Sequence, residues 1–143
     1  MPLDNVYAGA SDVGSYQLSA IPFVTSSAPG EVSTTPLRVG LPNVSRFVVV
    51  HNTSSNVLRF GFTENGVKGE GASVSGSNQP DQSNYFILSG NQVTDRLEVR
   101  CKELWFMQGG PAAAEFSLLA GLAPVRPSQF PALTGSAGYI GVG

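Results

Sequence analysis

The sequence predicts an all-β protein: a single antiparallel β-sandwich or jelly roll with extended N- and C-terminal arms. Three observations support this prediction. Short stretches of alternating apolar and polar residues recur along the chain, separated by turn residues, and no stretch shows a convincing helical period. Gly (17 residues) and Pro (10 residues) are abundant, which favours turns over long helices. Charged residues make up only 13% of the chain, and low charge is typical of surfaces that become covered by interfaces.

The chain length fits one domain with terminal extensions. At 143 residues the chain can bury enough surface in one core to need neither a metal nor a disulfide. We expect an N-terminal arm at residues 1–14, a β-sandwich domain at 15–122 and an extended C-terminal arm at 123–143. The N-terminal arm is small and polar without periodicity, so it should become ordered only where something holds it.

The first half of the predicted domain begins with three strands. Residues 16–25 alternate, but Pro22 removes a ladder donor, so this strand lies at a sheet edge or breaks there. A short strand follows at 37–41. Residues 45–52 form the clearest interior strand, because the continuous apolar run at 47–50 is typical of a strand that is covered on both faces.

The second half adds a hairpin, a long loop and further strands. A strand at 57–63 pairs with its predecessor across a turn of Asn, Thr and Ser residues. Residues 64–83 contain almost nothing to bury, so we expect a long loop without an element of its own. Strands at 84–89 and 114–121 complete the alternating pattern, and together the strands predict an antiparallel sandwich.

Residues 95–108 organise the predicted sandwich. Leu97, Val99 and Cys101 fall on one side of an extended strand, with charged residues on the other side. At Glu103 the alternation slips by one residue. A β-bulge there would return the next apolar side chains to the same face and bend the strand, so that it crosses between the two sheets. Cys101 is the only cysteine, which excludes an internal disulfide, and we expect it to be a buried apolar residue.

The C-terminal arm is apolar but cannot fold alone. Its prolines at 124, 127 and 131 exclude a helix or a central strand, whereas disordered tails are normally poor in large apolar residues. The arm must therefore lie against its own sandwich or against a neighbouring subunit. The residues that we expect to make oligomer or capsid contacts are Val125, Phe130, Leu133, Tyr139 and Ile140.

The chain shows no signature of an enzyme. His51, the only histidine, has no catalytic motif around it, so we expect a structural role. Glu98 and Glu103 have basic neighbours on the same stretch, which indicates solvated charge pairs rather than a glycosidase pair. The glycines at 66–71 lack the Lys-Ser/Thr pair and the helix of a P-loop, and no metal-binding spacing is present. We therefore predict a protein that is not an enzyme and that binds neither a metal nor a cofactor.

The same reasoning limits the partners. A net charge of −2 gives no general attraction for nucleic acid. No apolar run approaches the ~20 residues of a membrane helix, and the first residues do not resemble a signal peptide. Tyr85 and Trp105 could form a stacking surface for sugars, which defines an alternative function as a carbohydrate-binding module for host-glycan attachment.

Three segments and the tail together resemble a known class of protein. The segments are 84–88 (NYFIL), 97–106 (LEVRCKELWF) and 116–122 (FSLLAGL), and the Pro-rich tail contains 133–136 (LTGS). This arrangement resembles the small auxiliary capsid proteins of double-stranded DNA viruses, chiefly tailed bacteriophages, which are called decoration or cement proteins. The likeness covers the C-terminal part of the chain well and the first half loosely, and the long loop at 64–83 departs from it.

The resemblance implies a β-sandwich or jelly-roll subunit, often trimeric, on the outside of an icosahedral shell. Such a structural virion protein would stabilise the capsid by bridging neighbouring capsid subunits and would have no catalytic residues. Its partners would be the major capsid protein and further copies of itself, with a homotrimer favoured. It would be located on the capsid exterior of the virion, after synthesis in the host cytoplasm.

Overall fold

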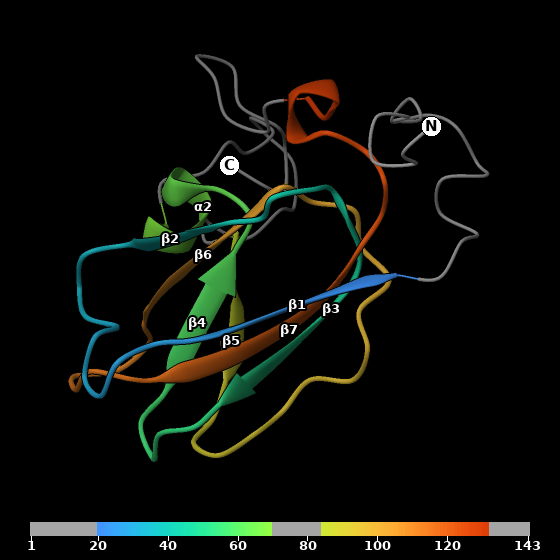
Figure 1. The fold of residues 1–143 in the computed structure, drawn as a ribbon. Helices are drawn as coiled ribbons and strands as arrows, with labels where there is room; N and C mark the ends of the chain where they lie inside the picture. Colours follow the sequence, from blue (N-terminus) through green and yellow to red (C-terminus); the bar gives the residue numbers. More distant parts are fainter. Residues whose placement is uncertain (1–19, 70–83, 132–143) are drawn as a thin grey trace, which may run out of the picture.

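The computed structural model describes residues 20–69 and 84–131, which form two antiparallel β-sheets packed face to face (Figure 1). The strands are β1 (Ile21–Ser26), β2 (Leu37–Gly40), β3 (Ser45–Asn52), β4 (Leu58–Gly61), β5 (Phe86–Leu88), β6 (Glu103–Gln108) and β7 (Phe116–Leu122). The first sheet has the order β1-β7-β3, and the second sheet has the order β2-β6-β4-β5. The predicted all-β sandwich is therefore confirmed.

The core lies between the two sheets and is built from the inward-facing half of each strand. In β7, Phe116, Leu118 and Ala120 are buried, whereas the residues between them face outward. The ring of Phe106 in β6 stacks on that of Phe116 with centroids 3.8 Å apart and planes at 4°, so the sheets meet in direct aromatic contact. Phe60 in β4 extends this contact, with its centroid 6.2 Å from that of Phe106. Burying side chains of this size stabilises a fold by roughly 1.5–3 kcal/mol each.

The first strand lies at a sheet edge, as its proline predicts, but the third strand is not covered on both faces, although its apolar run predicts this. β1 contains Pro22 and forms an edge of the first sheet, where the missing N–H costs no ladder bond. In β3, only Val48 and Val50 of the apolar run are fully buried, and Phe47 and Val49 are partly exposed. The expectation that both faces are covered is therefore wrong, because no described element packs over the outer side of this sheet.

The predicted crossing between sheets occurs, although not within one strand. Leu97 forms a bridge with Val48 of β3, and the backbone N–H of Ser45 donates to the carbonyl of Cys101 at 2.9 Å. The chain bends at Lys102 and then enters the second sheet as β6. The slip in alternation thus marks the passage from one sheet to the other rather than a bulge in a continuous strand.

The long loop predicted at 64–83 hides a short helix, α2 (Glu64–Lys68). Thr63 caps its N-terminus by accepting a hydrogen bond from the Gly66 N–H at 2.9 Å, and Gly69 ends it in the left-handed region at φ 87°. Val67, the one large apolar residue of the helix, is fully buried. The prediction of a loop with nothing to bury is therefore wrong for these residues, because one apolar side chain between two capping residues is enough to dock a single turn.

The first part of the C-terminal arm lies on its own chain. Ala123 and Val125 form a small buried cluster with Val44, and backbone hydrogen bonds of 2.8 and 3.0 Å join the two segments. A 3₁₀-helix, η2 (Pro127–Gln129), follows, and Phe130 packs against the same cluster. Of the arm residues predicted as contacts, Val125 is therefore interior. Leu133, Tyr139 and Ile140 lie outside the described residues, as does the N-terminal arm at 1–14.

Candidate interaction surfaces

The outer face of the first sheet carries an apolar row. The registers β1–β7 and β7–β3 align Val24, Leu119 and Val49 across the three strands. All three residues point away from the core, and Val24 and Leu119 are 68% and 41% exposed. We call these three residues the outer apolar row. A contiguous apolar surface of this kind is typical of interaction sites, whereas single exposed apolar residues are not informative.

Uncharged residues lie on both sides of the outer apolar row. On one side Phe47 covers Gly121, because a Cβ at Gly121 would approach the Phe47 ring to 2.2 Å. The guanidinium of Arg96 lies 4.4 Å from the centre of that ring and marks the polar border of the face. On the other side Ser26 and Ser117 are joined by a hydrogen bond of 2.8 Å between their hydroxyls. The face therefore offers apolar packing with a thin polar border.

The helix α2 covers part of the outer face of the second sheet, over β4 and β6. Trp105 in β6 pairs with Gly61 in β4. A Cβ at Gly61 would lie 3.7 Å from the Cβ of Val67, so this helix residue sits directly over the glycine. The indole nitrogen of Trp105 is buried and has no hydrogen-bond partner among residues 20–69 and 84–131. The second sheet is therefore covered around Gly61, whereas Ile87 on its edge strand β5 stays 53% exposed.

Neither of the two aromatic residues predicted to bind sugar is fully exposed. The guanidinium of Arg59 lies over the ring of Tyr85, 4.5 Å from its centre. The same side chain contacts the sulfur of Met107 through Nη2 at 3.0 Å. Tyr85 and Trp105 are both partly buried, and Val67 packs beside the Trp105 strand. A sugar ring needs an accessible aromatic face, so this geometry does not favour the carbohydrate-binding alternative.

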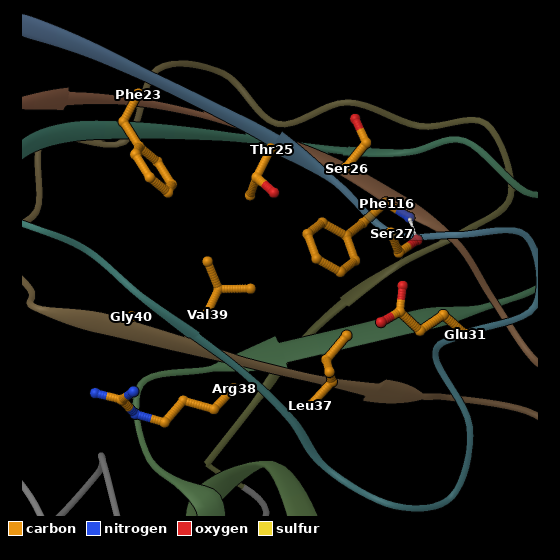
Figure 2. Close-up of a pocket in the computed structure, with 10 residues that line it drawn as sticks. All are labelled: Phe23, Thr25, Ser26, Ser27, Glu31, Leu37, Arg38, Val39, Gly40 and Phe116. Atoms are coloured by element: carbon orange, nitrogen blue, oxygen red, sulfur yellow. Dashed lines mark hydrogen bonds between the residues drawn. The ribbon is translucent and has the colours of Figure 1, made fainter.

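A groove of about 320 Å³ opens between β1 and β2, the facing edge strands of the two sheets (Figure 2). Its walls are apolar: Phe23 lies on one side, with Leu37 and Val39 on the other, and Phe116 lines the interior end. Thr25 also points into the groove. These side chains are only partly covered, except for Phe116, so the sandwich core is accessible along this edge.

Charged groups at the groove are already engaged. Glu31 accepts a hydrogen bond from the backbone N–H of Ala28 at 2.6 Å and stands at one end. Arg38 points away from the groove and pairs with Glu103. The guanidinium of Arg38 lies close over Gly40, where a Cβ would come within 2.8 Å of it. The interior of the groove is therefore uncharged.

Both sides of the groove are strand edges. Among the strands in residues 20–69 and 84–131, β1 pairs only with β7 and β2 pairs only with β6. The opposite edges of β1 and β2 carry backbone N–H and C=O groups that a further extended segment can pair with.

Sequence reasoning missed a buried polar contact that joins the two sheets. Asn52, at the end of β3, is fully buried and donates through Nδ2 to the carbonyls of Asn56 and Leu88 at 2.7 and 3.2 Å. Its Oδ1 accepts from the Ser54 N–H at 3.0 Å. Asn in a turn is a common sequence signal, but its contact with β5 depends on a partner 36 residues away.

A second buried polar contact holds the point where the chain changes sheets. The Ser45 hydroxyl donates to the carbonyl of Val99 at 2.8 Å and accepts from the Cys101 N–H at 2.9 Å. Cys101 is buried as predicted, and this burial raises the pKa of its thiol from 9.0 to about 11, while its hydrogen bond with Ser45 acts in the opposite direction.

The remaining candidate residues lie on the surface. His51 is exposed at the end of β3 and forms a bridge with Val93 through the backbone. Glu98 pairs with Arg96 at 2.7 Å, and both side chains are more than half exposed. Charge pairing was expected at Glu98 and Glu103. Glu98 pairs with a basic residue of the same stretch, whereas Glu103 pairs with Arg38 of β2. The described residues contain no group of three or more His, Cys, Asp or Glu side chains that could hold a metal.

The fold defines the class of this protein, a sandwich of two antiparallel sheets. Comparisons with known proteins add no family to it. No protein-family model matches the chain, and no curated protein matches it. A solved structure described under the words "Bacillus endospore appendages form a novel family of disulfide-linked pili" is similar at a TM-score of 0.37 and 9% identity. The match covers 71% of this chain and 86% of that one. None of the helices in the part of the chain that the structure describes is long and apolar enough to span a membrane.

Proposed function

We propose that this protein is a structural component of a virion that binds a viral capsid and stabilises it by bridging neighbouring capsid subunits. In this proposal its partners are the major capsid protein and further copies of itself, with a trimer favoured. It sits on the capsid exterior after synthesis in the host cytoplasm. The sequence resemblance to decoration proteins suggests this function, and the surfaces described above supply the contacts.

The observation that carries the proposal is the outer apolar row. Val24 and Leu119 hold large apolar side chains in solvent on a sheet face that no described element covers. Burying a fully exposed side chain of this size contributes roughly 1.5–3 kcal/mol, and the gain is smaller at Leu119, which is only 41% exposed. A partner with a flat apolar surface would therefore gain binding energy here without pairing any charge.

A contact as small as the outer apolar row can stabilise a shell when it is repeated over many copies. A single three-residue row is small compared with a stable protein interface, which buries roughly 800 Å² per partner. When several copies are linked, the second and third contacts form at high effective concentration, and avidity rises by about 10²–10⁴. Modest contacts repeated over a closed shell can therefore stabilise the shell more than any one contact could.

The test combines the two exposed members of the row. We expect Val24→Asp/Leu119→Asp to lower co-sedimentation with purified capsids at least tenfold, because two carboxylates would be desolvated in the contact. Both side chains are exposed, so circular dichroism should show an unchanged fold.

A matched control uses the same chemistry on the other sheet. Ile87→Asp places a carboxylate on β5 at a residue that is 53% exposed. It should leave co-sedimentation unchanged. If the double variant sediments with capsids as well as the unmodified protein, the proposed contact face is wrong; if the unmodified protein does not bind capsids, the proposed function is wrong.

A further inference from the structure

We infer that the groove between β1 and β2 binds residues 132–143 of a second copy of this chain as an extended strand. This inference rests on the proposed bridging function, because it identifies where the C-terminal arm of one subunit attaches to its neighbour. The exchange is heterologous: the arm of one copy enters the groove of the next, and three or more copies can close into a ring.

The backbone geometry of the groove favours a strand as its occupant. β1 and β2 are edge strands, and in the described part of the chain their groove-facing edges have no strand partner. An extended segment between them would pair with an edge through its own N–H and C=O groups, as in β-strand addition. Affinity then comes from the main chain, and specificity comes from the side chains that point into the groove.

The side chains of the groove favour an apolar and uncharged occupant. Phe23, Leu37 and Val39 are partly covered members of the core that extend into the groove. The carboxylate of Glu31 at one end would repel an acidic segment. Arg38, the cation among the lining residues, points away toward Glu103.

The chemistry of residues 132–143 matches these requirements better than that of residues 1–19. The C-terminal segment has no charged side chain and no proline, so each of its residues keeps a backbone donor. The N-terminal segment contains Asp4 and Asp12. In an extended conformation Ile140 and Val142 point to the same side, and both are β-branched residues suited to a strand. We therefore place this pair in the groove.

The length of the segment permits the exchange. Its 12 residues span up to about 40 Å when extended. The base of the arm is fixed on its own subunit, since Lys102 donates to the Phe130 carbonyl at 3.3 Å and Val125 is buried against Val44. One copy can thus hold the base of the arm firmly while its end binds a neighbour.

Disulfide trapping between two differently labelled chains tests this inference. One chain carries Thr25→Cys in the groove and the other carries Ile140→Cys in the arm. The native Cys101 is buried and should not compete, because burial raises the pKa of its thiol. We expect a covalent heterodimer in the mixture at least tenfold above the dimers formed by either chain alone, in free protein or on capsids.

The control moves the groove cysteine to an exposed threonine elsewhere. Thr53→Cys, just after the end of β3, replaces Thr25→Cys, and it should give no heterodimer with the arm variant. Absence of a trapped heterodimer both in solution and on capsids overturns the inference. A double variant, Thr25→Cys/Ile140→Cys, that instead forms an intramolecular disulfide at high dilution also overturns it, because the occupant would then be the arm of the same chain.

The inference and the proposed function can fail separately. Capsid binding that depends on Val24 and Leu119, without trapping at Thr25, would leave the function standing and exclude this attachment site. Trapping without capsid binding would support strand exchange between copies and exclude the proposed function.

Discussion

The outer faces of the two sheets differ in how far the chain itself covers them. On the second sheet, α2 places Val67 over Gly61, and Arg59 covers the ring of Tyr85. On the first sheet, Val24 and Leu119 stay in solvent. The chain itself thus covers the middle of one face and leaves Ile87 exposed at its β5 edge, whereas the other face has apolar side chains and no described cover. The difference indicates where a partner gains most, because an apolar face that is already covered offers little further burial.

The largest effect is expected at the contact that joins the sheets rather than at either face. Asn52→Ala should lower the free energy of unfolding by about 3 kcal/mol, because it leaves buried carbonyl groups of the turn and of β5 without their donor. Urea denaturation measures this change. The adjacent His51→Ala is the control, since His51 is exposed, and it should change stability by no more than about 0.5 kcal/mol. Equal losses for the two variants would contradict this account of Asn52.

The free energy of unfolding should depend on pH through Cys101, which lies where the chain crosses between the sheets. The raised thiol pKa of Cys101 means that the unfolded chain loses this proton near pH 9 while the folded chain keeps it to about pH 11. Stability from this group is therefore constant below pH 9 and falls as the pH rises toward 11, by up to about 2–3 kcal/mol. We expect Cys101→Ala to be less stable at pH 7 but to show a flatter decline between pH 9 and 11. Parallel declines for the two proteins would exclude this linkage.

The two outer faces can be compared directly with one substitution in each. Val67→Ala removes a fully buried side chain from the cover of the second sheet and should cost about 2 kcal/mol. Val24→Ala makes the same change in the outer apolar row, where 68% of the residue is exposed, and should cost less than about 0.5 kcal/mol. Thermal unfolding of the isolated protein measures both. A large loss for Val24→Ala would mean that its face is already covered within one chain.

Sequence patterns predict the strands of this protein well because each strand has one buried face. Phe116 and Leu118 alternate with other residues in the sequence, and both are buried in the structure. Cys101, which precedes the slip at Glu103, is buried as well. The pairing of the strands is not predictable in this way. The predicted hairpin between the strands at 45–52 and 57–63 is wrong, because β3 pairs with β7 in one sheet and β4 pairs with β5 and β6 in the other. The outer apolar row joins Val24 to Leu119, and the two residues are brought together only by the strand order of the first sheet.

The sequence did not predict two features of the structure, the helix α2 and the groove between β1 and β2. The helix α2 has a capping Thr63 and a terminal Gly69, which are recognisable signals, but its five residues show no helical period. The groove between β1 and β2 arises because these edge strands belong to different sheets. Local alternation contains no information on which strand edges face each other. The groove therefore cannot be placed without the strand order of the two sheets.

The smallest effect is expected for glycan binding at the covered part of the second sheet. Glycan-array binding should be absent both for the unmodified protein and for Trp105→Ala, because Arg59 covers Tyr85 and the indole nitrogen of Trp105 is buried. Phe86→Ala serves as a control for aromatic surface in general, since Phe86 is 61% exposed on the edge strand β5. The opposite result would be glycan binding by the unmodified protein that Trp105→Ala abolishes without unfolding it and that Phe86→Ala leaves intact. That outcome would mean that the cover over the second sheet opens in solution, and it would move the binding surface of this protein from the first sheet to the second.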